Sequence, residues 1–235
     1  MLSKRRFRPR LWPTLITLPA VIVMLGFSGW QLERRAWKHE LIALRVARIA
    51  APSVPLPAKP DLERFEYRKV SLRGRYLHSK ELYVGARSRR GNLGYHVYTP
   101  FAARDGTVVL VNRGWIPLSR KDPGQRRRGQ IVGEIELVGH LRIGGRKGAF
   151  TPDNVPSDNF WFYVDIPAMA DHVGIRKARP FYLQAAGQPP PGGWPRPVGV
   201  WIDMPDNHLK YAFTWLALAV GLLVIYLLYH RRRPD

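Results

Sequence analysis

Two apolar stretches set the class of this protein: LWPTLITLPAVIVMLGFSGWQL at Leu11–Leu32 and YAFTWLALAVGLLVIYLLY at Tyr211–Tyr229, neither with a charged side chain. A helix rises about 1.5 Å per residue, so each stretch can cross a hydrocarbon layer of roughly 30 Å. The alternatives are buried core helices or, for the first stretch, a signal peptide. The sequence WQLERR that follows from Trp30 offers no convincing cleavage site. We predict transmembrane helices at 11–32 and 208–229.

The short tails predict the topology. Basic residues cluster before the first apolar stretch, in tail 1–10, and after the second, in tail 230–235. Basic residues in short flanks stay on the cytoplasmic side of a membrane. We therefore expect both termini inside, and a central domain at 33–207 that faces the periplasm of a bacterial cell with an inner membrane.

Composition narrows the function classes. The 235 residues include 38 Lys and Arg against 17 Asp and Glu, which gives a formal net charge of +21, and there is no cysteine. Zero cysteines exclude a disulfide scaffold, a thiolate zinc site and a cysteine nucleophile. The charge invites a nucleic-acid reading, but the basic central domain would face the wrong compartment. We expect no nucleic-acid partner, and anionic lipid or an acidic protein surface instead.

The central domain is predicted to be mainly β. Glu33–Ala50 continues as a helix out of the membrane, and the proline-rich segment Ala51–Pro60 is extended. A short helix is expected at Pro167–Val173. Strands are expected at 68–77, 81–86, 94–101, 107–111, 131–143, 159–164 and 181–185. No alternation of strands with helices occurs, so the prediction is a membrane α+β protein whose exported domain is a mainly antiparallel sheet or small barrel.

Sequence motifs of catalysis are missing from the chain. It contains no phosphate loop, no GxSxG, no HExxH and no close cluster of metal-ligating residues. We therefore expect no enzyme. Its histidines are scattered, and His96, among aromatic residues of a predicted strand, is best explained as a satisfied core or surface side chain.

His208 is placed differently. Asn207 is a candidate helix cap, so His208 begins the second membrane helix, and Tyr211 and Trp215 follow on the same helix face. A helix N-terminus favours the neutral imidazole, which can ligate a metal, and the flat aromatic rings could line a porphyrin. The alternative is an interfacial anchor with Trp215 facing lipid.

Three stretches together resemble the Surfeit locus protein family. Leu25–Ile42 (LGFSGWQLERRAWKHELI) resembles its first-helix signature, Gly94–Pro117 with Val111–Trp115 (VNRGW) its central motif, and Asn207–Ala219 (NHLKYAFTWLALA) its second-helix signature. The resemblance covers nearly the whole chain in the right order. It implies a non-catalytic biogenesis factor for cytochrome c oxidase, a haem–copper oxidase, that binds haem a and aids its insertion.

The resemblance also implies roles for single residues. His208 falls on the family histidine proposed as an axial ligand of the haem iron, and Tyr211 and Trp215 would shape the pocket. Arg113 could meet a haem propionate; alternatively it pairs with a structural acid where the strand ends, while Gly114 makes a turn. Gln31 is expected to face the second helix, and so is Trp30 unless it is an interfacial residue.

The implied partners are the catalytic subunit of cytochrome c oxidase, the lipid bilayer and, as a further possibility, haem a synthase. A competing hypothesis needs no haem. In it the chain is a membrane scaffold that stabilises an oxidase assembly intermediate.

Overall fold

The structure, a computed structural model, describes residues 6–7, 9–145, 147–202 and 204–232. It divides into two compact units. The first, the helix pair, comprises Met1–Leu44 and Ile202–Asp235, and the second, the β domain, comprises Arg45–Trp201. The fold class is α+β, as predicted, with two long apolar helices and a domain built on strands.

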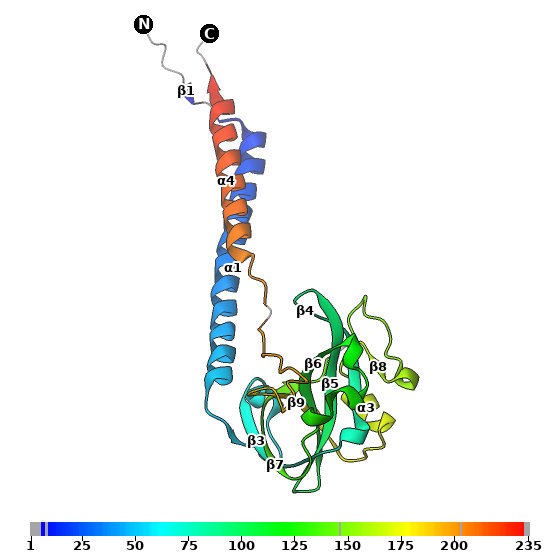
Figure 1. Ribbon diagram of the computed structural model, residues 1–235. Helices are drawn as coiled ribbons and strands as arrows, with labels where there is room; N and C mark the ends of the chain where they lie inside the picture. Colours follow the sequence, from blue (N-terminus) through cyan, green and yellow to red (C-terminus); the bar gives the residue numbers. More distant parts are fainter. Residues whose placement is uncertain (1–5, 8, 146, 203, 233–235) are drawn as a thin grey trace. The chain divides into compact units, whose positions relative to one another are not determined.

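Two helices form the helix pair. Helix α1 (Leu11–Ala50) and helix α4 (His208–His230) are, of the described residues, the two helices long and apolar enough to cross a membrane. They run antiparallel, with the start of α1 and the end of α4 at the same end of the pair in Figure 1. Strand β1 (Arg6–Phe7) pairs there with strand β10 (Arg231–Arg232). The predicted helical continuation to Ala50 is confirmed.

The contact between the two helices follows a repeat of 3.5 residues. Less exposed positions along α1 include Thr14, Thr17, Val21, Met24, Ser28, Gln31, Arg35 and Lys38. On α4 they include His208, Ala212, Trp215, Ala219, Leu222 and Tyr226. We call this contact the seam. It is narrow because small side chains let the backbones approach, so that Ser28 Oγ donates to the carbonyl oxygen of Ala212 at 3.0 Å.

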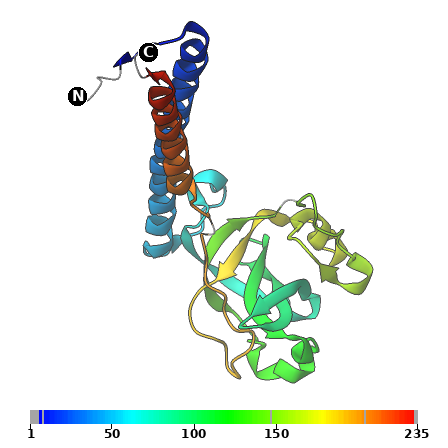
Figure 2. The same ribbon diagram turned by 90° about the horizontal axis from the view of Figure 1, so that it is seen from above.

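The β domain is built on a barrel. Its sheet has the order β2-β3-β7-β9-β6-β5-β4-β8, and a further pairing of β3 with β5 closes β3, β7, β9, β6 and β5 on themselves (Figures 1 and 2). The strands are β2 (Val54–Pro55), β3 (Lys69–Tyr76), β4 (Leu82–Arg89), β5 (Asn92–Ala103), β6 (Val108–Pro117), β7 (Ile135–Ile143), β8 (Phe160–Trp161) and β9 (Ala178–Ala185). The short helices are α2 (Leu62–Phe65), α3 (Ile166–His172), and the 3-10 turns His78–Lys80, Leu118–Arg120, Pro123–Gly129 and Pro156–Asp158.

Most strand pairs are antiparallel, as predicted, but three are parallel: β2 with β3, β4 with β8, and β6 with β9. The parallel pairing of β6 with β9 is possible because the long chain between them carries β7 and α3. Periodicity does not specify such a partner, since it records only which face of a strand is buried.

The two larger of three apolar clusters form most of the core of the β domain. One has Phe101, Val111 and Leu183 among its buried members, and the other joins Trp161 and Met169 to the opposite face of the same strands. Strand β6 is buried from Val109 to Ile116 because it has packed residues on both faces. It therefore extends beyond the predicted 107–111.

Two other predicted strands are shorter in the structure. Only Phe160–Trp161 of the predicted strand at 159–164 pairs. Asn159 adopts a left-handed conformation with φ 48° before it, and after it the backbone N–H groups of Phe162 and Tyr163 donate to Asn154 Oδ1. The predicted strand at 131–143 begins at Ile135, after Gly133 at φ 91°. In both places a positive φ takes the chain out of the extended conformation.

Candidate functional site

The site begins where helix α4 begins. The helix begins at His208 and Asn207 is its N-cap residue, as predicted, but the Asn207 side chain makes no cap hydrogen bond. Asp206 Oδ1 instead accepts a hydrogen bond from the His208 backbone N–H at 3.1 Å. A carboxylate suits this position because it meets the unpaired N–H groups of the first helical turn.

The imidazole of His208 lies against Gln31 of α1. His208 Nδ1 is 2.7 Å from Gln31 Oε1, and both residues are on the seam. An amide oxygen only accepts, so Nδ1 carries the hydrogen and the lone pair of the neutral ring is on Nε2. Among the described residues this is the one hydrogen bond of the His208 side chain. The expectation that Gln31 faces the second helix is confirmed.

Aromatic rings flank the seam next to His208. Trp215, two turns further along α4, has its ring centroid 5.0 Å from that of Phe27 on α1. Tyr211 lies beside the seam and is 54% exposed, so it leaves a flat ring accessible on the outer side of the pair. Trp30 is also exposed, at 53%, as an interfacial residue would be.

A group of polar residues, here called the polar collar, surrounds the start of α4. Asp206 Oδ2 is 2.7 Å from His39 Nε2 and 3.5 Å from Arg35 Nε, and Lys38 donates to the carbonyl of Pro205. The hydrogen bond from His39 is the main reason that the pKa of Asp206 is lowered. The collar ties the segment before α4 to α1, which fixes the position of His208.

These residues fit a porphyrin better than a bare metal ion. Within the described part of the chain there is no group of three or more His, Asp or Glu that could hold a metal. A single imidazole is enough for a haem, because the porphyrin supplies the other ligands of its iron. The Gln31 contact also resembles the outer-shell hydrogen bonds that orient histidine ligands in metal sites.

Arg113 belongs to strand β6 of the β domain, where it lies in a β-bulge. Val97 pairs with Gly114 and Tyr98 with Asn112, so Arg113 is the extra residue on β6. Gly114 has φ 130° and approaches the carbonyl of Arg196 too closely for any side chain. The expectation that Gly114 makes a turn at a strand end is wrong; it makes a bulge inside a strand, and bulges redirect side chains.

The redirected guanidinium enters a buried cluster around Glu81. Arg113 Nη1 donates to Glu81 Oε1 at 2.9 Å, and Arg126 Nη2 donates to Glu81 Oε2 at 2.6 Å. The side chains of all three residues are at most 4% exposed. Arg113 also donates to the carbonyl of Gly129 and lies over the Tyr76 ring. The alternative of a structural acid partner is therefore present in the structure, and we name this group the Glu81 cluster.

The charge state of Glu81 follows from the cluster. Burial on its own would raise the pKa of Glu81, but hydrogen bonds from His78 and Arg126 and the charges of Arg126 and Arg113 lower it to about 2. The carboxylate is thus ionised at neutral pH. No sequence pattern singles out Glu81 or Arg126, because Arg126 lies in a basic run, Gln125–Arg128, that is typical of a solvated loop.

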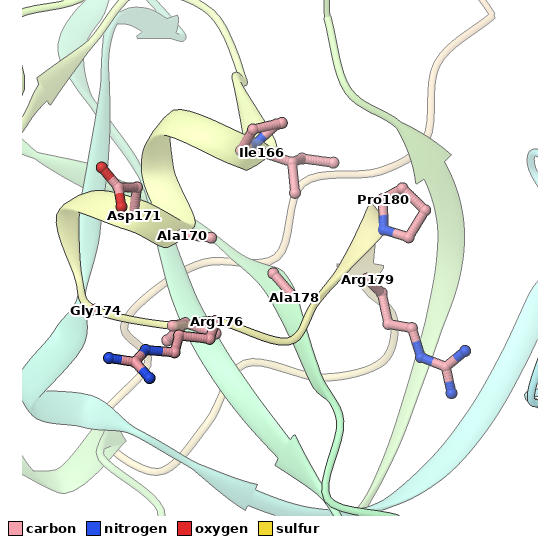
Figure 3. A pocket seen from close by; sticks show the side chains of 10 residues that line it. Ile166, Ala170, Asp171, Gly174, Arg176, Ala178, Arg179 and Pro180 are labelled. Carbon is pink, nitrogen blue, oxygen red and sulfur yellow. The ribbon is translucent and has the colours of Figure 1, made fainter.

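A separate cavity lies between α3 and β9 (Figure 3). Ala170, Gly174 and Ala178 form much of its lining, and the charged ends of Asp171, Arg176 and Arg179 point away from its centre. Arg179 pairs with Asp105 at 3.0 Å. The cavity therefore presents small apolar groups and no converging acid and base.

Comparison with known proteins identifies a family and several relatives that this sequence is similar to. The sequence matches the SURF1 family over residues 17–220. It is 38% identical to Surfeit locus protein 1 of Mus musculus, over 88% of this chain and 71% of that protein, and 38% identical to Surfeit locus protein 1 of Homo sapiens, over 88% and 73%. A SURF1-like protein of Monosiga brevicollis is 34% identical over 94% of this chain and 88% of its own length.

The matched region runs through both apolar helices and the barrel, including His208, Gln31 and the Glu81 cluster. The chain therefore belongs to the SURF1 family, a family of membrane proteins known as cytochrome c oxidase assembly factors and not as enzymes.

Proposed function

We propose that this protein is a cytochrome c oxidase biogenesis factor of the bacterial inner membrane that binds haem a at His208 and aids its insertion into the catalytic oxidase subunit. The observation that carries the proposal is the 2.7 Å contact of His208 Nδ1 with Gln31 Oε1, because it leaves the lone pair of the ring on Nε2. Haem iron takes such an imidazole nitrogen as an axial ligand.

The surroundings of His208 support a planar apolar ligand. Trp215 and Phe27 lie along the seam, and Tyr211 presents an accessible ring on the same stripe of α4. Aromatic side chains provide large apolar contact areas with few rotatable bonds, which suits a flat macrocycle. The polar collar keeps His208 at the end of the helix pair, where a ligand can enter and leave without crossing a packed core.

Release is as important as binding for a delivery factor. A haem held by His208 alone would be bound less firmly than one held by two side chains, which would suit its transfer to the catalytic oxidase subunit. Haem a synthase is the natural supplier in this scheme, and the lipid bilayer holds all three proteins in one plane. Arg113, locked in the Glu81 cluster, has no role in this proposal beyond the stability of the β domain.

The test is the visible spectrum of the full chain purified from cells that make haem a. We expect a haem a signal in the unchanged protein and its loss in His208→Ala. In Gln31→Leu, which removes the acceptor of the Nδ1 hydrogen, haem occupancy should fall by about tenfold or more. His172→Ala is the matched control, because this exposed histidine belongs to the β domain and has no part in the helix pair.

The same preparation separates the proposal from the scaffold hypothesis. A haem signal that survives His208→Ala would remove His208 as the ligand. If no haem is found in any preparation while the catalytic subunit still co-purifies with His208→Ala, the chain acts as a scaffold and the haem proposal is wrong.

A further inference from the structure

We propose that the β domain carries a second binding site, specific for a carboxylate, on the outer face of its barrel. The site is a cavity of about 360 Å³ beside strands β4, β5, β6, β7 and β9, with Val198, Gly199 and Trp201 also in its lining. Its volume is within the range of small-molecule pockets. All of its lining residues belong to the β domain, so the inference does not depend on His208.

Positive charge dominates the cavity. Arg87 and Arg142 line it, and no Asp or Glu does so among the described residues. Arg87 donates to the carbonyl of Phe162 at 3.2 Å and, in the part of the chain that the structure describes, has no carboxylate within ion-pair distance. A half-buried guanidinium of this kind gains from an added anion, because its charge is only partly solvated.

Arg142 supplies a second positive charge to the cavity. Its Nε is buried and has no hydrogen-bond partner among the described residues, although Glu66 Oε1 lies 3.9 Å away. The guanidinium stacks 4.4 Å over the Tyr67 ring, which fixes its plane. Because Nε itself is enclosed, the contribution of Arg142 to the cavity is its positive charge beside that of Arg87.

The floor of the cavity is a fixed network of neutral polar groups. Asn112, which is buried, lies with Nδ2 3.0 Å from Gln184 Oε1 and 3.4 Å from His96 Nδ1. Gln184 in turn donates to the carbonyl of Val198 at 2.8 Å. Burial, together with the charges of Arg87 and Arg89, lowers the pKa of His96 to about 4, so the ring is neutral near pH 7. The network orders the floor before any ligand arrives.

The lining favours a carboxylate attached to a ring. Guanidinium groups bind planar carboxylates through parallel N–H bonds, which a single ammonium group does not provide. Tyr98, Tyr163 and Tyr182 offer aromatic surface inside, and Trp201, 78% exposed, stands at the edge. Two sources share this chemistry: a free small aromatic acid, and the carboxylate arm of a larger ring such as a porphyrin.

The experiment uses the full chain in detergent micelles and measures binding of benzoate and of benzamide by saturation-transfer NMR. We expect benzoate to bind and its uncharged analogue not to. Arg87→Gln should weaken benzoate binding by about tenfold or more, since it removes a charged hydrogen-bond donor. The control Arg75→Gln changes an exposed arginine of β3 and should leave binding unchanged. Equal binding of the two probes, or no effect of Arg87→Gln, would overturn the proposal.

Two further arms complete the test. His208→Ala should bind benzoate normally, which separates this site from the haem proposal. Metal-free deuteroporphyrin is added as a competitor. It has two propionates but no iron, so it cannot bind through a bond between iron and a side chain, and its dimethyl ester, which has no free carboxylate, is the control. Displacement by the free acid alone assigns the site to a porphyrin arm, and absence of displacement assigns it to small acids. If Arg87→Gln lowers the melting temperature, Arg142→Gln replaces it as the charge-removing variant.

Discussion

His208 in the helix pair and Arg113 in the β domain were both predicted to serve one cofactor, yet their surroundings are opposite. Arg113 donates to Glu81 and to a backbone carbonyl inside a buried cluster. His208 is half-buried, has one side-chain hydrogen bond among the described residues, and keeps Nε2 available. A side chain whose hydrogen bonds are complete stabilises a fold, whereas one with an unused lone pair at an accessible place can bind.

The largest expected effect concerns the Glu81 cluster. Glu81→Gln removes the only carboxylate that, within the described residues, pairs with Arg113 and Arg126. Two buried guanidinium groups then lose their counter-charge, which should lower the free energy of unfolding by about 3–5 kcal/mol. Thermal unfolding of the β domain, followed by circular dichroism of the full chain, measures this. A loss below about 1 kcal/mol would show that the cluster is hydrated.

Acid should release the same stabilisation without a mutation. The pKa of Glu81 in the folded protein is about 2, against 4.5 for an unperturbed group. The folded state therefore binds this proton less readily, and the contribution is complete above about pH 4.5 and is lost as the pH falls toward 2. The expected loss is about 3 kcal/mol, measured by denaturant unfolding across this range.

His96 provides the internal control for the acid experiment. Its folded pKa of about 4 lies below the ordinary 6.5, so its contribution is present above pH 6.5 and is lost as the pH falls toward 4. Glu81→Gln should abolish the loss below pH 4 and keep the loss above it. An unchanged profile in this variant would mean that other carboxylates cause the acid instability.

A smaller effect on stability is expected at His208. His208→Ala removes one hydrogen bond from a half-buried place, so the free energy of unfolding should fall by about 1 kcal/mol only. Because the chain has no cysteine, the pair Ser28→Cys and Ala212→Cys can report on the seam by disulfide cross-linking. We expect equal cross-linking with and without His208→Ala. Weaker cross-linking would give His208 a structural role like that of Arg113.

The smallest effect on stability is expected for a surface ion pair, and it is the baseline for the stability predictions above. Glu134 pairs with Arg104 on the surface, with side chains 47% and 64% exposed. Exposed ion pairs contribute little because water screens them and both side chains lose freedom. Glu134→Gln should leave the melting temperature unchanged within error. A clear decrease would show that loss of negative charge as such destabilises this basic chain, and the Glu81→Gln result would need correction by that amount.

Local sequence carried much of the architecture. The lengths of the two apolar stretches predicted α1 and α4, and the strands expected at 68–77, 94–101 and 107–111 are found as β3, β5 and β6. These signals are local because a helix or a hairpin is specified by neighbours along the chain. His208 could also be singled out from its place at the start of an apolar helix, whereas Gln31 was expected to face that helix only from the family resemblance.

The remaining features depend on residues far apart in the chain. Glu81 and Arg126 meet across 45 positions, and Arg87 reaches the same cavity as Arg142 only after the barrel has closed. The bulge that turns Arg113 inward is visible only in the register of β5 against β6. By itself the sequence determined the elements and the His208 stripe, because helical and strand periods are local. Only the tertiary structure decided which charged groups are buried together, because burial and pairing arise when distant strands pack.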